Sequence, residues 1–101
     1  MRRVLHGDLV QMGRMLLTCR TTEREATCRR AILQAHAADK YRKRFGRRHP
    51  GFGDGSLASW AMRFPRPPEP PLDDPDYAAC LRLILDCLEE ARRSWKDAGT
   101  R

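Results

Sequence analysis

The sequence predicts an all-α protein: a helical hairpin, a short third helix, a proline-rich strut and a long C-terminal amphipathic helix. Apolar residues recur at helical spacing in four separate stretches, and residues that cap helices stand at their beginnings. No stretch alternates apolar and polar residues as a half-buried strand does. A chain of 101 residues forms one small domain with a lean core.

The first two helices are predicted over residues 8–19 and 22–45. Asp8 stands where an N-cap is needed, and Thr22 with Glu25 has the spacing of a capping box. The short connection between the two stretches favours an antiparallel hairpin. The apolar line of the second helix, which we expect to face the core, consists of Ala26, Leu33, Ala37, Tyr41 and Phe45.

A short third helix is predicted over residues 56–64, with Ser56 as its cap. It is followed by residues 65–74, a proline-rich strut that cannot be helical because proline lacks the backbone donor. The last helix is predicted over residues 75–98, where Asp74 precedes a proline at the first helical position.

The C-terminal helix carries an apolar seam at heptad spacing that is broadened on both sides, so the helix needs a partner surface on more than one side. We expect it to pack on the rest of the chain or on a neighbouring subunit, so the sequence predicts a homo-oligomer. The predicted oligomer-interface residues are Tyr77, Leu81, Ile84, Leu88 and Trp95. The four cysteines match no zinc module in their spacing, so no metal site is predicted and core packing is expected.

Positive charge gathers in the part of the chain before the strut, the basic helical region of residues 1–64. Residues 1–66 hold 15 Lys and Arg against 5 Asp and Glu, a net +10, whereas residues 67–101 hold 5 against 8, a net −3. The dipole of a helix end accounts for two or three cations, fewer than gather here. We therefore expect a phosphate backbone as partner. The predicted nucleic-acid-binding residues are Arg29, Arg30, Lys40, Arg42, Lys43, Arg44, Arg47 and Arg48.

Other interpretations of this basic cluster stay open. It could bind an acidic protein, or it could be the solvated end of a helix. Tyr41 and Phe45 lie within it and could stack on bases, but their spacing with Leu33 and Ala37 favours the core. The turn between the first two helices lacks the usual glycine and the second helix is long for a recognition helix. Sequence-specific DNA readout is therefore not expected.

Catalysis is not predicted either. The three histidines have no carboxylate or nucleophile at a fixed spacing, and capping explains the aspartates around Pro75. The glycine-rich GFGDGS follows no strand and precedes no Lys-Ser or Lys-Thr pair, so it is not a nucleotide-binding loop. We expect no enzyme and no cofactor. No apolar run resembles a signal peptide or a membrane span, which favours a cytoplasmic protein without membrane partners.

Three stretches, RRVLHGDL, AADKYRKRFGRRHPGFGDGSLASWA and LDDPDYAACLRLIL, resemble an uncharacterised family of small alphaproteobacterial proteins. This resemblance implies the small terminase subunit of phage-like gene transfer agents, an oligomeric adaptor that presents DNA to a large terminase. The expected function is thus a non-enzymatic, small-terminase-like DNA-packaging adaptor that binds the DNA backbone without sequence specificity. The alternatives are a helical adaptor or regulator that binds an acidic partner, and a small transcriptional regulator.

Overall fold

The computed structural model describes residues 1–97 and confirms the all-α fold class. Four α-helices and one 3-10 turn follow one another, and no strand occurs among the described residues. Ala98 and Gly99, where the sequence predicts the end of the last helix, lie outside them. The elements are α1 (His6–Leu16), η1 (Thr21–Glu23), α2 (Arg24–Phe45), α3 (Leu57–Ala61) and α4 (Pro75–Asp97).

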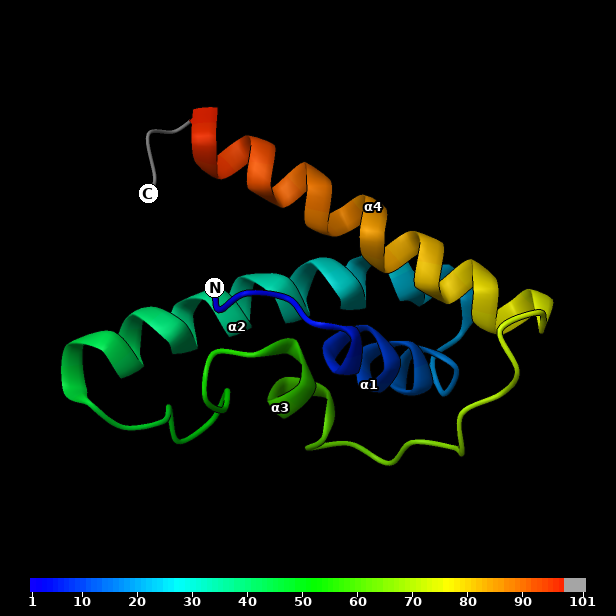
Figure 1. Ribbon diagram of the computed structural model, residues 1–101, viewed down its shortest axis with the longest axis horizontal. Helices are drawn as coiled ribbons and strands as arrows, with labels where there is room; N and C mark the ends of the chain where they lie inside the picture. The colour runs from blue at the N-terminus through cyan, green and yellow to red at the C-terminus, as the bar shows by residue number, and fades with distance from the viewer. Residues whose placement is uncertain (98–101) are drawn as a thin grey trace.

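The two long helices, α2 and α4, run in the same direction and diverge toward their C-terminal ends (Figure 1). α1 runs opposite to α2, but it packs mainly on α3 and α4. No described helix is long and apolar enough to cross a membrane. The core lies between the four helices, and its largest buried apolar side chains are Met12, Leu16, Ile32, Leu57, Trp60, Tyr77 and Ile84.

Asp8 lies inside α1 rather than before it, so the predicted N-cap is wrong by three residues. Its carboxylate accepts a hydrogen bond from the Leu5 backbone N–H at 2.8 Å, which satisfies a donor at the start of α1. The second oxygen accepts from the Ala58 N–H at 2.9 Å, in the first turn of α3. One buried carboxylate thus joins the beginnings of two helices.

The predicted capping box at Thr22 and Glu25 does not form, because η1 occupies this part of the chain and α2 begins only at Arg24. The side chain that holds this junction is that of Arg24. It donates to the backbone carbonyls of Leu16 at 3.0 Å and Cys19 at 3.3 Å. Its two terminal nitrogens bind the Asp76 carboxylate at 2.6 and 3.2 Å, which fixes the end of α1 and the start of α4 to α2.

The predicted apolar line of α2 is also wrong. Leu33 and Phe45 are 61% and 54% exposed, and Ala26 and Ala37 are exposed as well. The buried face consists of small residues, namely Cys28, Ala31, Ala35 and Ala38, together with Ile32. Small side chains allow the backbones of neighbouring helices to approach, and this face is therefore the one that meets α3 and α4.

The predicted oligomer interface is largely used within the chain. A Cβ atom at Gly13 would lie 2.8 Å from Leu81 Cδ2 and 3.0 Å from the Tyr77 ring, so α1 and α4 cross closely there. Tyr77, Ile84 and Leu88 are buried in the single chain, which corrects their assignment to a contact with a neighbouring subunit. Leu81 and Trp95 remain partly exposed, and Trp95 stacks on His36 at 4.0 Å between ring centroids.

The other predicted caps form as expected. The Ser56 hydroxyl accepts from the Ser59 N–H at 3.1 Å at the start of α3, and the Asp74 carboxylate accepts from the Tyr77 N–H at 2.9 Å in α4. The proline-rich segment between these helices contains no helix or strand. Arg14 holds it to α1 by donating to the Pro67 carbonyl at 2.7 Å.

Asp54 organises the turn before α3, and its replacement gives a pH-dependent prediction. Its carboxylate accepts from the Ser56 N–H at 2.9 Å and the Ser56 hydroxyl at 2.7 Å. Burial raises the pKa of Asp54, but these hydrogen bonds outweigh burial and lower the pKa from 3.8 to about 2. Because the pKa of Asp54 is lower in the folded chain than in the unfolded chain, its ionised carboxylate stabilises the fold at pH values above the unfolded pKa of 3.8. This contribution is lost as the pH falls to about 2. We expect Asp54→Asn to be less stable than wild type at pH 7 in urea unfolding, with the difference shrinking between about pH 4 and pH 2. A difference independent of pH would contradict this assignment.

Candidate nucleic-acid interface

The last turn of α2 and the loop after it form an exposed basic surface. Three basic residues stand in the last turn, and α2 ends at Gly46 in the left-handed conformation. The exposed guanidinium groups of Arg42, Arg44, Arg47 and Arg48 have no Asp or Glu within ion-pair distance among residues 1–97. We call these four residues the arginine cluster.

Two of the eight predicted cations are neutralised within the chain. Lys43 Nζ lies 3.0 Å from the buried Asp39 carboxylate, one turn earlier in α2. Arg29 forms a 2.6 Å ion pair with Glu90 of α4, and this contact raises the pKa of Arg29 and lowers that of Glu90. Arg29 therefore ties α2 to α4 and lies away from the arginine cluster.

Arg30 lies on another side of α2, near Arg63 of the segment that follows α3. Burial and the nearby charge of Arg30 lower the pKa of Arg63. Arg63 donates to the carbonyls of Gly51 and Trp60, and neither arginine has a carboxylate partner among the described residues. Arg63 was not predicted as a site residue, because only the fold brings it to α2.

Lys40 lines a groove of about 510 Å³ between the N-terminal segment, α2 and the end of α4. Arg2, Arg3, Lys43 and Arg92 line it as well, so cations from three parts of the chain converge there. Arg2 pairs with Asp54 at 3.2 Å. Asp39 is the acidic residue of the groove lining, and it is buried between Lys43 and the Met1 ammonium. The sequence did not predict Arg2, Arg3 and Arg92 as site residues, since their separation along the chain gives no local pattern.

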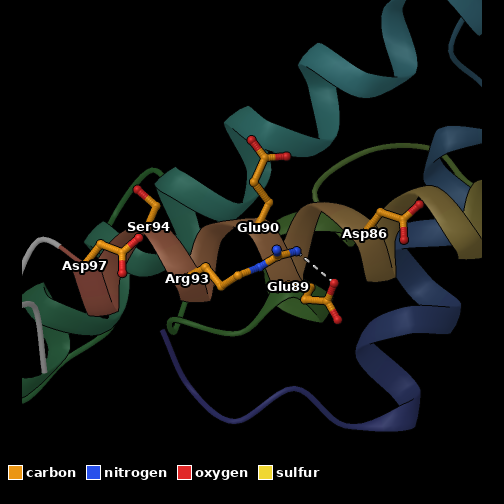
Figure 2. Close-up of a pocket in the computed structure, with 6 residues that line it drawn as sticks. All are labelled: Asp86, Glu89, Glu90, Arg93, Ser94 and Asp97. Carbon is orange, nitrogen blue, oxygen red and sulfur yellow. Dashed lines mark hydrogen bonds and ion pairs between the residues drawn. The ribbon is translucent and has the colours of Figure 1, made fainter.

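Negative charge lies on a different surface, the outward side of α4. Figure 2 shows Asp86, Glu89 and Asp97 along this helix, with Arg93 bound to Glu89 at 2.9 Å, whereas Glu90 projects toward α2. The acids therefore do not neutralise the arginine cluster. The molecule has separate basic and acidic surfaces, and a polyanion would approach the end of α2 that carries the cations.

No three His, Cys, Asp or Glu side chains in residues 1–97 lie close enough together to hold a metal ion. Cys28, Cys80 and Cys87 are buried free thiols, in agreement with the predicted core packing, and burial raises the pKa of each. The arrangement offers guanidinium donors, which recognise phosphate oxygens well.

Comparison with known proteins identifies a family but no function. A family model described as domain of unknown function (DUF7742) matches residues 2–88. No curated protein and no solved structure matches the chain. The resemblance to an uncharacterised family is therefore confirmed. A function has to be inferred from the fold and the charge distribution.

Proposed function

We propose that this chain, which belongs to the DUF7742 family of unknown function, binds the phosphate backbone of duplex DNA without sequence specificity. The observation that carries this proposal is the arginine cluster, four exposed guanidinium groups with no carboxylate partner in the described residues. Each would release condensed counterions from DNA on contact, which is the main source of non-specific affinity. Lys40 and the groove beside it would extend the same surface.

The placement of the cations favours backbone contact over base readout. Sequence-specific helix-turn-helix proteins insert the first residues of a recognition helix into the major groove. Here the cations lie in the last turn of α2 and in the loop after it. Guanidinium groups around a helix C-terminus can bind phosphates on either side of a groove, but contacts to phosphates do not distinguish one base sequence from another.

The biological role that we propose is that of a small-terminase-like DNA-packaging adaptor, non-enzymatic and oligomeric, that presents DNA to a large terminase. This part rests on what the resemblance of the three sequence stretches to an uncharacterised family implies, namely the small terminase subunit of phage-like gene transfer agents. An adaptor that packages DNA without selecting a sequence needs phosphate affinity alone, which agrees with the charge distribution. Its oligomer would form through surfaces other than the buried Tyr77, Ile84 and Leu88.

The proposal is tested by titrating the protein against a random-sequence DNA duplex at several salt concentrations. If four phosphates are contacted, the logarithm of affinity should fall with the logarithm of salt at a slope of about −4. Affinity would then weaken by about two hundredfold between about 50 and 200 mM salt. Absence of binding at low salt would refute the proposal and favour an acidic protein partner. Protection of one preferred site against competitor DNA would refute the non-specific mode and favour a transcriptional regulator.

A further inference from the structure

A row of aromatic rings crosses the basic surface from the end of α2 to α3. Phe45 contacts Tyr41 at 4.6 Å between ring centroids, and Tyr41 contacts His49 at 4.9 Å. His49 stacks on Phe52 at 4.5 Å with the two planes 6° apart. The row continues through Arg63, whose guanidinium carbon lies 5.9 Å from the Phe52 centroid. It reaches Trp60 and Phe64 beyond, each 5.0 Å from Arg63.

The two ends of this ring row are exposed, which the core does not require. Phe45 is 54% exposed and Phe64 is 37% exposed, and both lie outside the main apolar cluster. Tyr41, His49 and Phe52 between them are half-buried and support one another. Exposing phenylalanine rings costs apolar burial, so the row indicates a surface that a ligand covers.

Cations accompany the rings along the whole row. Arg44 lies 5.5 Å from the Phe45 centroid, and Arg63 lies over three rings near the other end. Arg47 and Arg48 occupy the loop between these ends. None of these four arginines pairs with an Asp or Glu in the part of the chain that the structure describes. The ligand that fits is an anion with flat apolar faces.

Single-stranded DNA has both properties, whereas duplex DNA has one of them. In a duplex the base faces are stacked inside, so a protein surface meets phosphates and base edges but no base faces. An unpaired strand presents base faces and phosphates together, and proteins bind it with aromatic platforms beside basic grooves. An apolar protein partner would leave the guanidinium groups without counter-charges.

We propose that the ring row makes this surface a binding site for single-stranded DNA, with bases stacked on Phe45 and Phe64 and phosphates on the flanking arginines. This inference rests on the proposed function, because the same arginines supply the phosphate contacts. It goes beyond that function by assigning preference for an unpaired strand to the rings. An unpaired DNA end or junction would thus be bound in preference to continuous duplex.

The test compares a labelled single strand of about 12 nucleotides with the duplex of the same sequence by fluorescence anisotropy. The wild type should bind the single strand at least about tenfold more tightly than the duplex, as one or two stacked bases provide. Phe45→Leu with Phe64→Leu keeps the apolar bulk but removes the ring faces. This double variant should lose about tenfold to a hundredfold in affinity for the single strand and less than about twofold for the duplex. Leu85→Ala, at a 53% exposed apolar residue of α4, is the matched control and should change neither affinity.

The outcomes separate this inference from the proposal on which it rests. If the wild type binds duplex with the expected salt dependence and has no preference for the single strand, the ring row is not a stacking platform and only the backbone proposal survives. An equal loss of both affinities in the double leucine variant would also refute stacking. If neither DNA binds at low salt, both proposals fail, and the exposed rings then belong to a protein-docking surface. Circular dichroism of each variant checks that its fold is retained.

Discussion

Replacing all four residues of the arginine cluster, Arg42, Arg44, Arg47 and Arg48, by glutamine is expected to remove duplex DNA binding while leaving the protein folded. The four side chains are exposed and make no ion pair within the described residues, so the fold loses little when their charges are removed. A change of less than about 0.5 kcal/mol in the free energy of unfolding is typical of such surface positions. Affinity, by contrast, should fall by at least about a hundredfold at low salt, and the salt slope should approach zero.

The matched control removes the same number of charges elsewhere. Arg20, Arg82, Arg93 and Lys96 are exposed and lie outside the cluster, and all four can be replaced by glutamine together. If position matters, this control variant should keep most of the affinity and the slope of about −4. An equal loss in the two variants would mean that net charge alone attracts DNA. Retention of full affinity by the cluster variant would place the DNA contact on cations outside the arginine cluster, such as those of the groove beside Lys40.

Local sequence signals predicted the fold class well. The Ser56 and Asp74 caps are read from one turn of chain, and each forms as expected. The heptad spacing of α4 predicted an apolar seam, and three of its residues, Tyr77, Ile84 and Leu88, are buried. The spacing does not predict what the seam packs against, because an apolar face of α1 and one of a second subunit could bury it equally well.

The orientation of α2 could not be predicted from its pattern. Its apolar residues are spread around the helix, so large side chains such as Leu33 and Phe45 suggested a core face that tertiary packing overrides. Small residues form the buried face because they let neighbouring helices approach closely. A pattern of hydrophobic residues does not indicate this close approach.

Only the part of the candidate site that is local in sequence could be predicted. Local clustering identified the charges at the end of α2, and the spacing of Asp39 and Lys43, one turn apart, already allowed their ion pair. The pairing of Arg29 with Glu90 depends on a contact between residues distant in sequence. The ring row has the same origin, because Phe52 and Arg63 meet only when the loop folds back under α2 (Figure 1).

That loop depends on Gly55, and Gly55→Ala is expected to be strongly destabilising. Gly55 has φ +99°, and a Cβ atom there would lie 2.8 Å from Asp39 Cα in the α2 backbone. A helix backbone cannot yield as a flexible side chain can, so overpacking adds to the conformational cost of a positive φ. Together they should lower the free energy of unfolding by about 3 kcal/mol, and the melting temperature by about 12 °C or more.

Gly46→Ala is the control that separates the two causes, because Gly46 also has a positive φ, +71°, but no atom within 4 Å of its would-be Cβ. Its variant should lose only the conformational part, about 1 kcal/mol. The difference between the two melting temperatures then measures how closely the loop packs on α2. Equal small losses would mean that the loop moves away from α2 at little cost. The contact between Phe52 and Arg63 would in that event not be fixed by the fold, and the ring row would form only when a ligand binds.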